Sequence, residues 1–355
     1  MKHILFWRRV LFSFLSAFFI LYSPTSEAGS IASFSNVFVF GDSLSDTGNV
    51  SAVTGCAAQP VPNGGLIPVA PYEGGRFSNG KVWVEVLADS LGKSVFPAAS
   101  GGTDFAFGGA RSGPSGGIPP AVPSLLDQFA MFSGVTGGIA PNDALYVVWG
   151  GANDVRDAVV TRLGGDEQEA QNILDTAVSN ITNVVGGLAG IGGQNFLVPN
   201  VPDLGLTPEA LSGEAGVSLV STALSQDFND SLHASLAGVE TGPGVNLIEL
   251  DIFSFLSLVR KSPSTFGFTN VSDPCVNLFS VCKDPSEYLF YDGVHPTAKG
   301  HAQIAGLALR HVVAEPELMA LLGIALCFLL LRRYFPPGKR VFWRWKKNKH
   351  VGGAL

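Results

Sequence analysis

The stretch Val37–Asn49, VFVFGDSLSDTGN, decides the fold of this 355-residue chain. Its first four residues are β-branched or aromatic, which is typical of a buried strand, and the strand pattern stops at Gly41-Asp42-Ser43. Ser43 is therefore predicted to follow the carboxyl end of a strand, which is the edge where open α/β sheets bind their ligands. Position alone also fits a serine that caps the next helix, because serine is a favoured N-cap residue.

A second segment, Tyr291–Pro296 (YDGVHP), favours a different interpretation of Ser43. It contains Asp292 and His295, an acid and an imidazole three residues apart. A serine hydroxyl becomes a useful nucleophile only beside a general base, and the base needs a third group that orients it. The sequence therefore predicts Ser43 as nucleophile, His295 as base and Asp292 as the acid that orients His295.

The chain between these two segments alternates between strand and helix patterns. Glycine- and proline-rich loops are predicted over 50–80 and 101–123. Strands separated by helices indicate parallel βαβ units and a sheet that is covered on both faces. The further strands are predicted over 143–150, 195–199 and 245–250, and the helices over 81–91, 167–188, 218–238, 252–261 and 297–313.

Two glycine-rich turns add groups that can face a ligand. Residues 104–110, DFAFGGA, include Gly109, and glycine lets backbone N–H groups approach a ligand closely. Residues 150–154, GGAND, follow a predicted buried strand and bring Asn153 to the same sheet edge as Ser43. For Asn153 alone, a turn-forming asparagine is the simpler interpretation.

Taken in order, GDSLSD, FGGA, GGAND and DGVHP resemble the four blocks of the GDSL lipase/esterase family, also called SGNH hydrolases. The resemblance covers residues 36–311. The stretches GRFSNG, PDLGLTP and GFTNV are similar to the branch that includes secreted and autotransporter esterases. The resemblance implies a flavodoxin-like three-layer α/β/α sandwich with a mostly parallel central sheet. It also implies hydrolysis of carboxylic esters without a metal or cofactor.

The resemblance also assigns roles to single residues. It places the oxyanion hole at the backbone N–H groups of Ser43 and Gly109 and at the side-chain amide of Asn153, beside the triad of Ser43, Asp292 and His295. Asp104 stands where the family usually has asparagine, next to the oxyanion loop. An acid at this position is expected to alter the activity without abolishing the site.

The N-terminal residues are expected to lie outside this domain. Residues 1–28 combine Lys2, Arg8 and Arg9 with an apolar run and end in Ser26-Glu27-Ala28, which is the layout of a secretory signal peptide. An uncleaved N-terminal anchor is the alternative. The hydrolase domain is then expected to span 29–313.

The C-terminal residues predict a sorting or membrane segment over 314–333 and a basic cytoplasmic tail over 334–355. Leu318–Leu331 is an apolar run, and the chain from Arg332 onward has eight Lys or Arg and no acid, which places that tail on the cytoplasmic side. The order Glu315-Pro316, apolar run and paired arginines resembles the PEP-CTERM signal of Gram-negative bacteria, which implies exosortase-type processing. Ala314 and the long tail depart from that pattern, so simple C-terminal anchoring stays open.

Charge and cysteine content narrow the classes of partner. Residues 29–313 contain 11 Lys or Arg against 26 Asp or Glu, a net charge of −15, which argues against a nucleic-acid partner because phosphate binding needs a basic face. Cys275 and Cys282 are predicted to form a disulfide, since they lie in one loop of an exported protein. No CxxC or paired-histidine spacing indicates a metal site.

These observations predict an exported serine esterase or lipase, held at the inner membrane facing the periplasm or sorted to the cell surface. The substrate stays open between a lipid or small acyl ester and an acetylated exported polysaccharide, so an O-acetyl esterase or an acyltransferase is an alternative. A non-catalytic surface or matrix binding protein is the alternative of another class. The Asp292 and His295 pair argues against it, because a binding module has no need of such a pair.

Overall fold

The computed structural model describes residues 34–54, 71–114, 122–240, 242, 244–277 and 280–313. The predicted signal peptide at 1–28 and the predicted C-terminal segments at 314–333 and 334–355 lie outside these residues. Across the described ranges, no helix combines the length and the apolar character that crossing a bilayer requires.

The centre of the fold is a four-stranded parallel sheet. Its spatial order follows the chain: β1 (Val37–Gly41), β2 (Leu145–Trp149), β3 (Asn195–Pro199) and β4 (Asn246–Leu250). The carboxyl ends of the strands meet at one edge, where Gly41 pairs with Trp149. This architecture confirms the predicted α/β class with a parallel central sheet.

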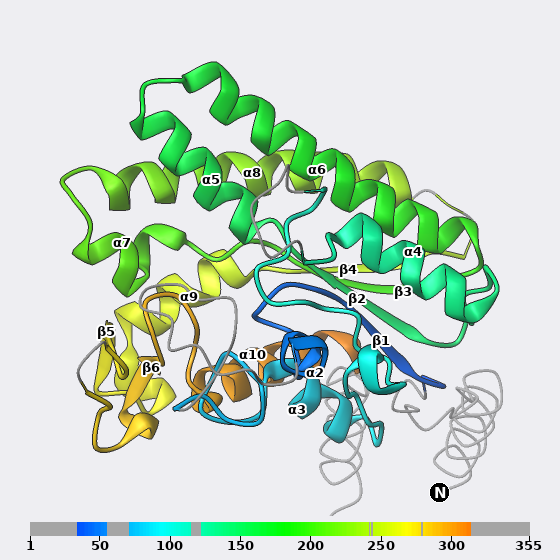
Figure 1. Ribbon diagram of the computed structural model, residues 1–355, viewed down its shortest axis with the longest axis horizontal. Coiled ribbons are helices and arrows are strands. Elements are labelled where there is room, and N and C mark those ends of the chain that lie inside the picture. The colour runs from blue at the N-terminus through cyan, green and yellow to red at the C-terminus, as the bar shows by residue number, and fades with distance from the viewer. Residues whose placement is uncertain are drawn as a thin grey trace, which may run out of the picture. The chain divides into compact units, whose positions relative to one another are not determined.

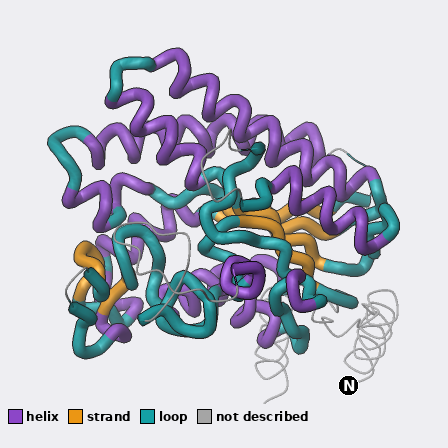
Figure 2. Tube along the Cα trace, viewed as in Figure 1, coloured by secondary structure: helices purple, strands orange, loops and turns teal. Residues whose placement is uncertain are grey.

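Helices cover both faces of the sheet and complete three layers (Figure 1). The side chains of β1 alternate between the faces, so Phe38 and Phe40 pack on one layer while Val37 and Val39 pack on the other. Figure 2 shows the strands enclosed between the two sets of helices. The first layer is α4 (Leu125–Thr136), α5 (Ala152–Leu163), α6 (Glu167–Gly190) and α8 (Val217–Glu240), and the second includes α3 (Trp83–Ser90) and α10 (Ala298–Val312).

Smaller elements stand near the carboxyl edge of the sheet. Two short parallel strands, β5 (Asn270–Pro274) and β6 (Tyr288–Phe290), pair with each other outside the main sheet. A disulfide joins Cys275 to Cys282, with the two Cα atoms 4.8 Å apart. The remaining helices are α2 (Asn49–Thr54), α7 (Pro208–Ser212) and α9 (Ile252–Lys261), with single 3₁₀ turns at Ala98–Ser100, Leu204–Leu206, Pro263–Phe266 and Pro285–Glu287.

Four helices, α2, α4, α5 and the short α7, are not among those that the sequence predicts. Residues 49–54 form α2, although the chain from Val50 onward was predicted as loop; Asp46 starts this helix by accepting the N–H groups of Gly48 and Asn49. Helix α4 was not predicted, and its capping box at Ser124 explains where it starts. Helix α5 follows Gly151 directly, so Asn153 lies in a first helical turn.

Candidate active site

Ser43 stands in the tight turn that follows β1. A Cβ atom on Gly41 would lie 2.5 Å from the carbonyl oxygen of Trp149, so only glycine fits between these two strands. Gln128 of α4 fixes the same residue, because its side-chain amide accepts the Gly41 N–H at 2.9 Å and donates to the Gly41 carbonyl at 2.8 Å. Both backbone polar groups of Gly41, two residues before the nucleophile, are therefore fixed by hydrogen bonds.

A chain of two short hydrogen bonds connects the three residues predicted as a triad. The Oγ atom of Ser43 lies 2.7 Å from Nε2 of His295, and Nδ1 of His295 lies 2.7 Å from Oδ2 of Asp292. Ser43 follows β1 and His295 stands just before α10, 252 positions apart in the chain. The structure thus brings all three together in the geometry that serine activation requires.

The carboxylate of Asp292 is surrounded by four donors. Its Oδ1 accepts the backbone N–H groups of Val294 and His295 at 2.9 and 2.8 Å, and its Oδ2 accepts the Tyr72 hydroxyl at 2.6 Å beside the imidazole. Burial opposes ionisation, but the charge of His295 and the hydrogen bonds from His295 and Tyr72 outweigh it and lower the pKa of Asp292 to about 2. Asp292 is an anion throughout the neutral range.

The segment 71–80 packs against the loop that carries His295 and forms hydrogen bonds with it. The ring of Phe77 lies 5.2 Å from the imidazole between centroids, and Ser78 Oγ donates to the carbonyl of Pro296. Asn79 accepts the N–H of Ala298, the first residue of α10, whose N-cap is Thr297. In the sequence, GRFSNG is recognisable only through its resemblance to the family, and Tyr72 carries no signal of a role in the site. Nothing in the pattern around Tyr72 indicates a partner 220 residues away.

Gly109 and Asn153 line the same pocket as Ser43 and His295. Gly109 has a φ of 80°, in the left-handed region that glycine adopts without strain. Its neighbours are fixed, since the Gly108 N–H donates to Asp46 and the Asn153 side-chain amide donates to the Ala110 carbonyl, both at 2.8 Å. The structure brings both predicted oxyanion groups to the pocket that contains Ser43.

Asp104 is absent from the residues that line this pocket. Its fully buried carboxylate accepts the backbone N–H and the hydroxyl of Thr47 at 2.7 Å and the N–H of Ala106 at 2.9 Å. Burial, and then the nearby Asp46 carboxylate, raise the pKa of Asp104. Hydrogen bonds to Asp104 therefore connect the segment before Gly109 to the turn after Ser43, and its side chain does not line the pocket.

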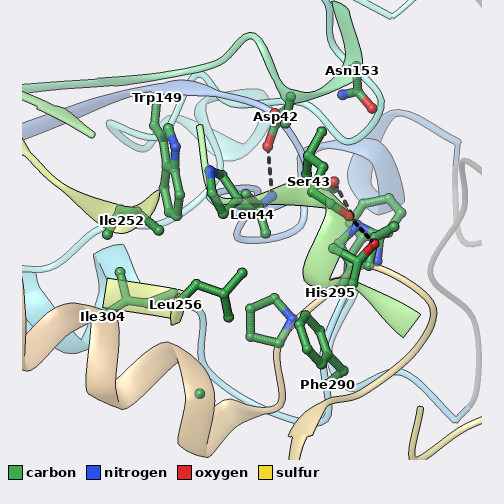
Figure 3. Close-up of a pocket in the computed structure, with 18 of the residues that line it drawn as sticks. Asp42, Ser43, Leu44, Trp149, Asn153, Ile252, Leu256, Phe290, His295 and Ile304 are labelled. Carbon is green, nitrogen blue, oxygen red and sulfur yellow. Dashed lines mark hydrogen bonds between the residues drawn. The ribbon is translucent and has the colours of Figure 1, made fainter. Parts of the chain in front are cut away.

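Apolar side chains form much of the pocket around Ser43 (Figure 3). In this view Leu44, Trp149 and Ile252 lie along one side of it, and Leu256 and Ile304 lie across from them. Within the described part of the chain, no three His, Cys, Asp or Glu side chains are grouped to hold a metal ion. The pocket therefore combines one hydrogen-bonded polar centre with an apolar wall.

Comparisons with known proteins identify relatives of this chain. The model of the family described as GDSL-like lipase/acylhydrolase matches residues 37–307. A GDSL esterase/lipase of Arabidopsis thaliana is 27% identical over 347 residues, which cover 89% of this chain and 99% of the plant protein. A second GDSL esterase/lipase of the same plant is 28% identical, over 81% of this chain and 91% of its own length.

Solved structures show weaker similarity. An acetylxylan esterase of Geobacillus stearothermophilus aligns with a TM-score of 0.43 at 14% identity, over 80% of this chain and 97% of its own. An extracellular lipase of Streptomyces rimosus aligns with a TM-score of 0.40 at 15% identity, over 79% of this chain and 99% of its own.

Proposed function

The chain belongs to the GDSL-like lipase/acylhydrolase family and is a carboxylic ester hydrolase, and from that premise we propose that Ser43, His295 and Asp292 are its catalytic triad. The observation that carries the proposal is the continuous pair of 2.7 Å contacts from Ser43 Oγ through the imidazole to Asp292. No other arrangement at the pocket links a hydroxyl to a base and an acid in this way among the described residues.

The reaction follows from these contacts. Ser43 Oγ attacks the acyl carbon of the ester while Nε2 of His295 takes the hydroxyl proton. Asp292 holds the ring with Nδ1 protonated and stabilises the imidazolium that forms. The imidazolium then protonates the departing alkoxide, which leaves an acyl-serine. A water molecule attacks this intermediate and passes a proton to His295. The imidazolium then returns that proton to Ser43 Oγ as the bond between Oγ and the acyl carbon breaks and the carboxylic acid leaves.

The tetrahedral oxyanion is assigned to three donors, the N–H groups of Ser43 and Gly109 and the side-chain amide of Asn153. An amide NH₂ group carries two hydrogens, so Asn153 can donate to the Ala110 carbonyl and to the oxyanion together. Asn153 also lies in the first turn of α5, where the helix dipole favours negative charge. Preorganised donors of this kind stabilise the transition state more than the ground state.

The test is covalent labelling of the full-length chain with an alkyl fluorophosphonate, followed by peptide mass spectrometry. The label is expected on Ser43 in the wild type, and Ser43→Ala should lose both the label and the hydrolysis of p-nitrophenyl esters. Ser45 lies in the same turn but donates no hydrogen bond to His295, so Ser45→Ala serves as the matched control. Labelling at another serine, or unchanged hydrolysis in Ser43→Ala, would refute the triad.

Export of the domain is proposed on two grounds. The sequence of residues 1–28 has the layout of a signal peptide, and the Cys275–Cys282 disulfide is a bond that persists in oxidising compartments. Anchoring through residues 314–355 is proposed from their sequence alone. Fractionation of expressing cells, with thiol alkylation before lysis, tests both: a reduced Cys275 in a cytoplasmic fraction would exclude export.

A further inference from the structure

The pocket at Ser43 has a volume of about 310 Å³, and one part of it is a mainly apolar cavity beside the nucleophile. The side chains that define it come from five separate parts of the chain: the turn after β1, the end of β2, α9, β6 and α10. Figure 3 shows them around an open space beside the nucleophile. They are Leu44, Trp149, Ile252, Leu256, Phe290 and Ile304.

Most of the cavity lies on the side of Ser43 away from the catalytic base, with Phe290 on the side of His295. In Figure 3, Leu44, Trp149 and Ile252 extend away from Ser43 in the direction opposite to His295. Because His295 must protonate the departing alkoxide, the alcohol part of an ester has to lie on the side of the imidazole. The part left for the cavity is the acyl chain.

The two ends of the pocket also differ in polarity. Asn153, Arg111 and Arg156 line the end near α5, and the two arginines form ion pairs with Asp157 and Glu209. The other end is lined mainly by apolar side chains, with Gln303 of α10 as a polar neighbour of Ile304. Two of the apolar residues there are almost without solvent exposure, 2% for Ile252 and 7% for Ile304. An acetyl group would leave this apolar space unfilled.

The volume sets the length of the chain that fits. An apolar protein cavity of about 150 Å³ holds benzene, which has six carbons, so about 310 Å³ corresponds to roughly twelve carbon-sized groups. The ester atoms and part of the alcohol occupy the polar end, which leaves room for an acyl chain of about eight carbons. A sixteen-carbon chain exceeds the space.

We propose that this cavity is an acyl-binding site that makes the enzyme selective for esters of medium-chain fatty acids. The inference rests on the proposed triad, because it assigns the acyl group of the same reaction. Leu256 of α9, which faces Leu44 across the cavity in Figure 3, limits the width available to the chain. Ile252 and Ile304 limit its length.

The test measures kcat/KM of the full-length chain for p-nitrophenyl esters from acetyl to palmitoyl at one fixed detergent concentration. Each added methylene should raise kcat/KM about fourfold up to about octanoyl, after which kcat/KM falls toward palmitoyl. Leu256→Trp should lower kcat/KM for octanoyl at least about tenfold and leave acetyl within about twofold. Leu258→Trp, on the same helix but 52% exposed, is the matched control and should change neither.

A second variant covers the case in which Leu256→Trp does not fold. Ile304→Ala enlarges the far end of the cavity and should move the preferred ester toward longer chains. The acyl site is overturned if acetyl is the best ester of the wild type, or if a folded wall variant changes all chain lengths equally. If Ser43 is labelled by the fluorophosphonate while acetyl is preferred, the triad stands and only the acyl site falls. If Ser43 is not labelled and no ester is hydrolysed, the triad fails first.

Discussion

Asp42 and Asp292 are two shielded carboxyl groups of the same site, yet they differ in ionisation. Burial raises the pKa of Asp42 to about 6, and the N–H of Leu44 offsets this only in part. Burial acts in the same direction on Asp292, but His295 and Tyr72 reverse it and lower the pKa to about 2. The loop after β1 therefore carries a carboxyl group with a raised pKa, and the loop before α10 carries one that stays ionised down to a much lower pH.

Asp46 shows which feature causes this difference. It accepts four backbone N–H groups, from Gly48, Asn49, Val50 and Gly108, and burial still raises its pKa to about 6. Neutral donors alone do not compensate for the loss of water around a buried carboxylate. What distinguishes Asp292 is direct contact with an imidazole that can become positive. Contact with His295 thus keeps the Asp292 carboxylate ionised.

The largest expected effect comes from exchanging each acid for its amide. Asp292→Asn turns an amide NH₂ or a weaker acceptor toward Nδ1 of His295, which favours the wrong tautomer, so kcat should fall by about 10³–10⁴-fold. Asp42→Asn is the matched control, because the Asp42 side chain accepts the Leu44 N–H and an amide oxygen can accept it equally. Its kcat should stay within about tenfold of wild type in steady-state assays with a soluble ester.

A comparable loss of activity in Asp42→Asn and Asp292→Asn would contradict the different roles assigned to the two carboxyl groups. Such a result would mean that Asp42 acts on the reaction directly and that position beside Ser43, more than contact with His295, decides the role of a carboxyl group here. Circular dichroism of both variants separates this outcome from a loss of folding.

A neutral donor gives the next effect in size. Asn153 carries no charge, and its assigned partner is an oxyanion that exists only in the transition state. Asn153→Ala should therefore lower kcat about 100-fold or more and leave KM nearly unchanged. Measuring kcat and KM separately decides the matter, since a rise in KM alone would mean that Asn153 binds the ground state.

The pH dependence of stability sharpens the comparison further. A carboxyl whose pKa rises from 3.8 to about 6 on folding stabilises the native state below pH 4, and that contribution is lost as the pH rises through 6. Asp42→Asn should remove on the order of 2–3 kcal/mol of this decline between pH 4 and 7. Asp292 has the opposite sign, because its contribution is present above pH 4 and is lost as the pH falls toward 2.

Each acid substitution is combined with Ser43→Ala, and urea unfolding at a series of pH values from 3 to 7.5 gives the free energy of unfolding. Its slope against pH is then compared between the variants. Asp42→Asn should flatten the upper range and Asp292→Asn the lower one. An unchanged slope between pH 4 and 7 in Asp42→Asn would assign the decline to other buried acids, such as Asp154, whose pKa burial also raises to about 6.

The sequence predicts the part of this site that depends on local pattern. The strand ending at Ser43, the acid and imidazole three residues apart, and Asn153 at the next strand end are visible because each sits in a short, characteristic stretch. The contact of Gln128 with Gly41 spans 87 residues, and nothing in the helix that carries Gln128 distinguishes it from a surface residue.

The acyl cavity was not visible for a related reason. Ile252, Leu256 and Ile304 have the spacing of core residues on amphipathic helices, and they would read the same way if α9 and α10 packed closely together. Only the three-dimensional arrangement shows that these faces leave a space beside Ser43. Periodicity identifies which side chains turn inward, but it does not determine whether they meet.

The smallest expected effect concerns the hydroxyl of Tyr72, one of four donors to Asp292. Tyr72→Phe removes this donor and should lower kcat about three- to tenfold, because His295 still holds the carboxylate. The loss should also raise the pKa of Asp292, so the decline of stability below pH 4 should begin at a higher pH. Tyr291→Phe is the control, since its hydroxyl donates to the Pro71 carbonyl in the same segment and does not touch Asp292. If both variants move the loss of stability at low pH equally, Tyr72 only holds the loop in place and does not lower the pKa of Asp292. If only Tyr72→Phe does so, the low pKa of Asp292 depends on this neutral hydroxyl as well as on the imidazole.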